Sequence, residues 1–119
     1  MQQWDLLEID APQGTRDPVV LYQDPGARAV LIVLQPGQQL GDHQVKENAW
    51  ITVLDGSVRV SAGGETATAA RGAMIRFDRN ERHSLASDDG ARVVMLLAPW
   101  PGEGHYQAGE PNYRSGDGR

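Results

Sequence analysis

The chain has 119 residues, enough for one hydrophobic core but not for two, so we expect a single domain over residues 1–119. Its 16 acidic and 11 basic residues give a formal net charge of −5 without a block of like charge, which argues against nucleic acid and anionic membranes as partners. Cysteine is absent, which excludes disulfides, thiolate metal sites and a cysteine nucleophile.

The beginning of the chain lacks a basic stretch followed by an apolar core, so no secretory signal is expected. The longest apolar run, residues 29–34, is far too short to span a bilayer. We therefore expect a soluble, cytoplasmic protein.

Short segments rich in β-branched and apolar residues alternate with Gly, Pro, Asp and Asn, a pattern typical of an all-β sandwich or barrel. No window keeps apolar residues at a 3.6-residue period, so little or no helix is expected. The predicted strands cover residues 19–22, 28–35, 50–54, 58–62, 65–69, 74–77 and 92–98. Hairpin turns are predicted where residues that tolerate positive φ separate two strands, at Asp55–Gly56, Gly63–Gly64 and Asp88–Asp89–Gly90.

Two of these segments, residues 29–34 and 93–97, are apolar on both faces. A strand that packs only on its own core alternates apolar with polar residues, so the second face of these strands must also be covered. One explanation is that the chain's own termini cover them. The other, which we favour, is a homodimer with these strands near the interface, because a large exposed apolar patch is unfavourable in water.

The last segment, residues 99–119, has the Gly-rich, Pro-rich and polar composition of a linker. Its aromatic residues Trp100, Tyr106 and Tyr113 are expected to anchor it on the barrel or on a partner. The barrel core then spans about residues 28–98 and follows N-terminal strands within residues 1–27.

Two glycine–histidine spacings stand out among the strands. The first comprises Gly37, His43 and Gly56, and the second comprises Gly72 and His83. Together they resemble the two motifs of the cupin superfamily over roughly residues 28–98. The resemblance implies an antiparallel double-stranded β-helix, also described as a jelly-roll barrel, and a dimer, which is common among cupins.

In cupins, two histidines and a glutamate of the first motif usually hold a divalent metal together with the histidine of the second. The resemblance carries this role only to His43 and His83, because Val45 and Ala49 occupy the positions of the other two ligands. Two histidines alone should bind a metal weakly. Either a third ligand completes an Fe, Mn, Zn or Ni site, or the protein functions without a metal.

Glu47 is the best candidate for the third ligand. In a regular strand it shares a face with His43, Val45 and Ala49, since side chains alternate between the two faces. It lies several ångströms along the strand from the vacated positions, so a bend or bulge must bring it inward. The alternative is that Glu47 is an exposed carboxylate in a turn.

The same alternation predicts a small-molecule cavity inside the barrel, with an apolar wall and a few polar groups. In residues 74–77, one face carries Met74 and Arg76 and the other carries Ile75 and Phe77. If the first face points inward, Arg76 places a cation in the cavity, suited to a carboxylate or phosphate; otherwise Arg76 lies on the surface. The predicted cavity residues are His43, Val45, Ala49, Ile51, His83 and Arg76.

Two functions are consistent with these patterns. The first is a small-molecule-binding cupin of unassigned substrate, in which the metal centre has degenerated. The second is a metal-dependent enzyme of the dioxygenase, isomerase or cyclase type that uses His43, His83 and Glu47. The sequence alone assigns no catalytic residue, and both functions imply a small organic molecule as partner.

Overall fold

The computed structural model describes residues 1–11 and 18–104, except for the side chains of Asp42 and His43. Over these ranges it contains strands and turns and no helix, as predicted, and accordingly no helix that could cross a membrane. The strands are β1 (Val19–Asp24), β2 (Ala27–Leu34), β3 (Gln39–His43), β4 (Asn48–Ala62), β5 (Glu65–Ala70), β6 (Met74–Phe77), β7 (His83–Ala86) and β8 (Ala91–Ala98).

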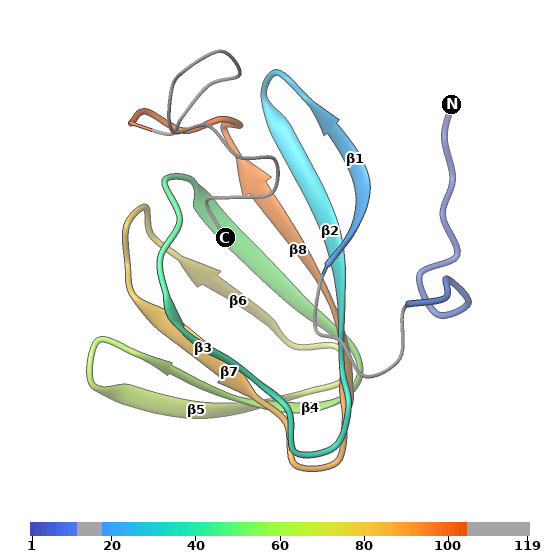
Figure 1. Cartoon of the computed structure of the whole chain (residues 1–119), viewed down its shortest axis with the longest axis vertical. Helices are drawn as coiled ribbons and strands as arrows, with labels where there is room; N and C mark the ends of the chain where they lie inside the picture. The colour runs from blue at the N-terminus through green and yellow to red at the C-terminus, as the bar shows by residue number, and fades with distance from the viewer. Residues whose placement is uncertain (12–17, 105–119) are drawn as a thin grey trace.

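The 15-residue strand β4 joins two antiparallel sheets. Its first half pairs with β8 and β6 and completes a sheet in the order β1-β2-β8-β4-β6. Its second half pairs with β7 and β5 and completes a sheet in the order β3-β7-β4-β5. The two sheets diverge from the bend in β4 and enclose the core between their inner faces (Figure 1). This is the curled antiparallel architecture expected for a jelly-roll barrel.

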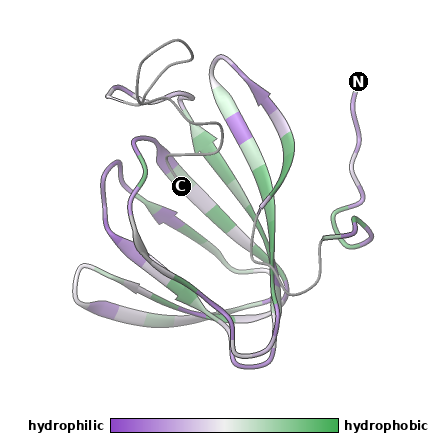
Figure 2. Cartoon of the chain, viewed as in Figure 1, coloured by the Kyte–Doolittle hydropathy of each residue, from purple (hydrophilic) through white to green (hydrophobic). Residues whose placement is uncertain are grey.

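Alternating residues of the central strands form the core. Val30 and Ile32 of β2, Ile51 of β4, and Val93 and Met95 of β8 are all at most 3% exposed. Figure 2 shows apolar residues along β2 and β8, two interior strands of the first sheet. Burial of each such side chain contributes about 1.5–3 kcal/mol to the free energy of folding, so these core residues are a major source of the stability of the fold.

The strand β4 continues through Asp55–Gly56, so the hairpin predicted there is wrong. Gly56 has a φ of 75°, and a Cβ at this position would lie 2.1 Å from the carbonyl oxygen of Gly90. The register of β4 against β8 also shifts between Val53 and Asp55. These features bend one continuous strand from the first sheet into the second.

The hairpin predicted at Gly63–Gly64 is confirmed, with φ values of 58° and 80° and Ala62 paired with Glu65. Residues 88–89 form a bend between β7 and β8, but the predicted hairpin is wrong because these strands pair with different halves of β4 and not with each other. The strands β3 and β7 were not predicted. Each is short and carries polar residues, which weakens its strand signal.

The outer faces of the two doubly apolar strands differ. Leu31 of β2 lies outside the core cluster and opposite Val94, yet it is 0% exposed, so the chain itself covers it. Leu96 of β8 is 42% exposed. Coverage by the chain itself therefore explains the apolar outer face of β2 but not that of β8.

Beyond β8 the chain is held against the barrel by Trp100. This residue is 9% exposed and belongs to the core cluster. The guanidinium carbon of Arg28 lies 4.8 Å from the centroid of its ring. The carbonyl of Trp100 also accepts a hydrogen bond from the N–H of Gly26. The predicted anchoring role of Trp100 is confirmed, whereas Tyr106 and Tyr113 lie outside the described residues.

Candidate functional site

The two motif histidines lie on neighbouring strands. His43 ends β3 and His83 begins β7, and the antiparallel register pairs their Cα positions directly. Each histidine of the two sequence motifs thus reaches the same region of the second sheet. The side chain of His43 is outside what the structure describes.

The side chain of His83 is 1% exposed. Its ring stacks on Phe77, with 4.0 Å between the ring centroids and 4° between the planes. Its Nδ1 lies 3.0 Å from the carbonyl oxygen of Glu81. Because a carbonyl can only accept, this hydrogen bond requires the proton on Nδ1 and leaves the lone pair of a neutral imidazole on Nε2.

Glu47 lies in the bend that precedes β4 and is 0% exposed. Val45 and Ala49 are also buried, at 1% and 0%, but Glu47 lies in a bend rather than in the regular strand on which the prediction of a shared face depends, so that prediction is not tested. The alternative of an exposed carboxylate in a turn is wrong. The Oε2 of Glu47 accepts a hydrogen bond of 2.7 Å from the N–H of Gly102, which ties the segment after β8 to the start of β4.

A pocket of about 210 Å³ opens between the β4–β5 hairpin and β6. Its apolar walls come from the inner faces of the two sheets, and Phe77 in its wall is the ring that stacks on His83. Two carboxylates, Glu65 and Glu81, lie among the lining residues. The full lining is Val60, Ala62, Glu65, Thr66, Ala67, Ile75, Arg76, Phe77 and Glu81.

The family to which this barrel belongs follows from its sequence. The family model of the cupin domain matches residues 30–99, more than half of the chain. The chain belongs to the cupin family. Among curated proteins, none matches this cupin significantly.

Solved structures similar to this cupin share its fold at low identity. An RmlC-like cupin protein from Desulfovibrio desulfuricans has a TM-score of 0.73 at 23% identity, covering 83% of this chain and 97% of the other. A conserved protein of unknown function from Streptococcus pyogenes has a TM-score of 0.71 at 22% identity, covering 82% and 86%. A Klebsiella pneumoniae protein with a double-stranded β-helix domain has a TM-score of 0.72 at 17% identity, covering 83% and 90%. These similarities establish the fold. They do not identify a ligand, which must be inferred from the residues of the site.

The donor set of this cupin fits a metal only in part. Among the side chains that the structure describes, no three His, Cys, Asp or Glu residues come close enough to hold a metal ion. This test does not include His43, so the predicted set of His43, His83 and Glu47 stays a prediction. The hydrogen bond from Nδ1 of His83 to a carbonyl is the arrangement that orients metal-binding histidines, whereas the carboxylate of Glu47 already binds a main-chain N–H.

The predicted apolar wall belongs to the packed core. Val45, Ala49 and Ile51 point inward and are at most 1% exposed, but they are members of the core cluster and do not line the pocket beside Phe77. Their contact with a ligand stays a prediction.

Of the two positions considered for Arg76, inside the barrel or on the surface, the structure shows the surface one, with the side chain 48% exposed. Arg76 contributes to the pocket edge, but its guanidinium carbon lies 5.5 Å from the ring centroid of Trp50 on the outer face of the sheet. Its nitrogens donate hydrogen bonds to Asp78 at 2.6 Å and Asn48 at 3.0 Å. Phe77 of the same strand is 2% exposed and Met74 is 65% exposed, so the other face of β6 points inward.

The sequence analysis missed most of the pocket residues. Ala62 and Ala67 are small residues in an ordinary hairpin, and the pairing of β4 with β5 places Ala67 opposite the buried Val60. Strand alternation from the Gly63–Gly64 turn would have predicted that face. The position of β6 opposite this hairpin depends on the tertiary fold and could not be predicted from the local sequence.

Proposed function

We propose that this cupin binds a small molecule with both apolar and polar groups in the pocket between the β4–β5 hairpin and β6. The observation that carries the proposal is the pocket's composition: five apolar side chains from both sheets beside four polar ones, which are Glu65, Thr66, Arg76 and Glu81. A mostly apolar concave site with a few polar groups is the usual form of a small-molecule site.

The size and charge of the pocket define the ligand class. Apolar cavities of about 150 Å³ hold a benzene molecule, so a pocket of about 210 Å³ suits one substituted ring or a short branched chain. Glu65 and Glu81 supply acceptors, and the guanidinium of Arg76 lies on the opposite face of the sheet. We therefore propose a ligand that presents hydroxyl or amine donors, rather than the anionic group that an inward Arg76 would have favoured.

A pocket-filling variant tests this proposal. Ala67 lines the pocket and is exposed, so Ala67→Trp should block the site without burying extra volume in the core. Thr68→Trp on the other face of the same strand is the matched control. In a fragment screen of phenols and small amines, we expect hits that shift the ring resonances of Phe77, the only phenylalanine of the chain.

Ala67→Trp should abolish these shifts and Thr68→Trp should preserve them. Hits whose binding survives Ala67→Trp would contradict the proposed site. A screen in which no compound shifts the Phe77 resonances would contradict the proposed ligand class.

A second candidate is a metal-dependent cupin enzyme, favoured by the register that pairs His43 with His83 and by the hydrogen bond that fixes the tautomer of His83. A bound divalent metal would supply Lewis-acid activation of water, oxygen or a carbonyl. Metal analysis after loading with Fe(II), Mn, Zn or Ni tests it. Stoichiometric metal lost in both His43→Ala and His83→Ala, and retained in His105→Ala, would support this function, and failure to load any metal would exclude it.

The cytoplasmic location and the lack of nucleic-acid and membrane partners remain proposals that rest on charge and composition.

A further inference from the structure

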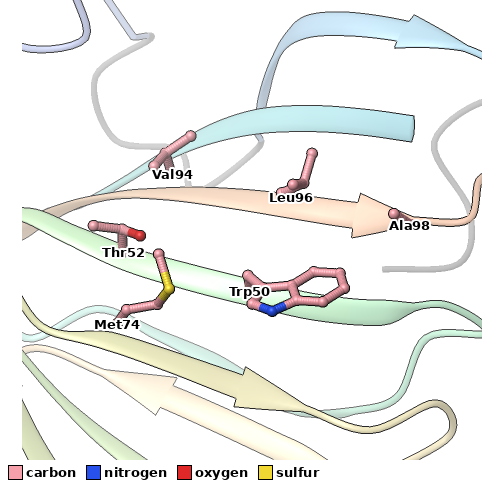
Figure 3. Close-up of a pocket in the computed structure, with 6 residues that line it drawn as sticks. All are labelled: Trp50, Thr52, Met74, Val94, Leu96 and Ala98. Atoms are coloured by element: carbon pink, nitrogen blue, oxygen red, sulfur yellow. The ribbon is translucent and has the colours of Figure 1, made fainter. Parts of the chain in front are cut away.

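Two surfaces of the barrel offer room for another polypeptide, an apolar face and a free strand edge. The apolar face is a groove of about 360 Å³ on the outside of β4, β6 and β8, termed the outer groove and shown in Figure 3. It is lined by Trp50, Thr52, Met74, Val94, Leu96 and Ala98. None of these residues carries a charge, so the outer groove does not select a partner by charge. The strand edge is more informative.

The free edges of the two sheets differ in how they are protected against pairing with another chain. Edge strands are commonly protected by short length, by β-bulges, or by Pro and Lys residues. Within residues 18–104, β1 has a register shift between Val20 and Tyr22, β3 has one between Leu40 and His43, and β6 has only four residues. The strand β5 has none of these features. It pairs with β4 through six consecutive residue pairs without a shift, and it contains neither Pro nor Lys.

The turn before β5 determines which main-chain groups of this strand point toward the free edge. The glycines of Gly63–Gly64 both have positive φ, as in a two-residue hairpin, so the flanking pair of Ala62 and Glu65 is hydrogen-bonded. Hydrogen-bonded and non-hydrogen-bonded pairs alternate along an antiparallel hairpin. The N–H and C=O groups of Thr66 and Thr68 therefore point away from β4, toward the edge of the sheet.

We propose that β5 binds an extended peptide segment of another protein, which adds to the sheet as a further strand. Strand addition takes its affinity from main-chain hydrogen bonds and its specificity from side chains at alternate positions. Thr66, Ala67 and Thr68 are small and exposed, so a second strand can approach β5 without displacing bulky side chains. The main-chain groups at this edge are distinct from the side chains of the pocket, so strand addition does not depend on the proposed small-molecule site.

Charge determines the kind of peptide that fits this edge. Glu65 begins β5 and is exposed, and the ion pairs between described residues, Arg59–Asp88 and Arg76–Asp78, do not involve it. A Lys or Arg directly opposite Glu65 on the added strand forms a favourable cross-strand pair. The net charge of −5 also attracts a basic peptide and repels a second copy of the same chain. We therefore expect a basic segment as the partner.

Nuclear magnetic resonance of the full chain with a synthetic peptide tests this interaction. The probe is acetyl-Val-Thr-Val-Thr-Lys-amide, which places its Lys opposite Glu65 in an antiparallel pairing, and the comparison peptide carries Glu in place of Lys. We expect the Lys peptide to shift the amide resonances of Thr66 and Thr68 and to slow their hydrogen exchange, with a dissociation constant below about 1 mM. The Glu peptide should bind about threefold more weakly or worse, because like charges directly opposite each other are unfavourable.

Two substitutions at one position separate main-chain pairing from side-chain contact. Thr68→Pro removes an outward N–H and leaves the hydrogen bonds to β4 in place, so it should abolish binding as read from the Thr66 amide. Thr68→Val keeps the N–H and should bind the Lys peptide as the wild type does. Glu65→Gln should make the two peptides bind equally. Leu96→Glu, in the outer groove, is the control and should leave binding unchanged.

The absence of shifts at Thr66 and Thr68 with about 5 mM Lys peptide would overturn the proposal. This measurement uses the wild-type chain and needs no variant to fold. Binding that survives Thr68→Pro, or that Leu96→Glu abolishes, would place the peptide elsewhere and also overturn it. Equal binding of the two peptides to the wild type would refute the preference for a basic segment. Concentration-dependent shifts of the same amides without peptide would show a second copy at the edge and would likewise contradict the proposal.

Discussion

The buried carboxylate of Glu47 allows a test of what this residue does. It is 0% exposed and accepts a hydrogen bond from the N–H of Gly102, so we expect it to anchor the segment after β8 whether or not a metal is present. Glu47→Ala removes the acceptor and leaves the N–H of Gly102 without it. Gly102 is itself buried, so water cannot easily replace the lost bond.

The expected loss follows from the type of hydrogen bond. A hydrogen bond to a charged group contributes about 1.5–3 kcal/mol, so Glu47→Ala should lower the free energy of unfolding by at least that amount. At roughly 4 °C per kcal/mol, the unfolding temperature should fall by about 6–12 °C. Glu47→Gln keeps a side-chain oxygen that can accept the same bond, so it should lose about 1 kcal/mol.

Urea and thermal unfolding of chelator-treated protein measure these losses without any metal contribution. Glu103→Ala is the matched control, because this neighbouring carboxylate is exposed and should change stability by no more than about 0.5 kcal/mol. If metal-free Glu47→Ala unfolds within about 0.5 kcal/mol of the wild type, the anchoring role is refuted. A ligand role alone would then remain for Glu47.

Three further predictions concern neighbouring parts of the fold. Gly102→Ala should lose about 1–3 kcal/mol in urea unfolding, because its Cβ would lie 2.1 Å from a main-chain oxygen, while Gly41→Ala, whose Cβ meets nothing within 4 Å, should stay near the wild type. Phe77→Ala should lose about 3–5 kcal/mol, since the ring is 2% exposed and stacked on a histidine; a loss below about 1 kcal/mol would contradict that packing. The hydrogen bond from Tyr22 to Asp24 raises the pKa of Tyr22 above 10.0, so ultraviolet titration should show one late-ionising tyrosine that Asp24→Asn returns toward its ordinary pKa.

The general architecture was predictable from local signals. Short β-branched segments and glycine turns specify an all-β fold, and the Gly63–Gly64 hairpin appears as predicted. Asp55–Gly56 misled the prediction because the same two residues suit a hairpin and a bend within one strand. The close approach of Gly56 to Gly90, which requires the bend, is a tertiary contact that no local pattern contains.

The candidate site was predictable from strand alternation only in part. The spacing of Glu47 relative to Val45 and Ala49 predicted an inward side chain in a regular strand, whereas the structure buries Glu47 in a bend, bound to the N–H of Gly102. Arg76 was ambiguous because each face of β6 carries at least one apolar residue that could belong to the core. The burial of Phe77 and its stacking on His83, set against the exposure of Met74, decide which face points inward.

The pocket beside Phe77 could not be derived from the motifs, because its walls come from β4, β5 and β6, and β5 and β6 pair with different halves of β4. The apolar groove on the outside of β4, β6 and β8 could be predicted from the sequence only in part. Once Ile51 is assigned to the core, Trp50 and Thr52 must face outward, but their proximity to Met74 and Leu96 depends on the pairing of β4 with β6 and β8.

The location of a bound ligand tests the central claim most directly. A crystal structure of the protein with a small amine or phenol identified by screening would show which surface the ligand occupies. The proposed function predicts a ligand between β5 and β6, in contact with Ala67 and Phe77 and within reach of Glu65 or Glu81. A ligand bound instead in the outer groove, against Trp50 and Leu96, would contradict it.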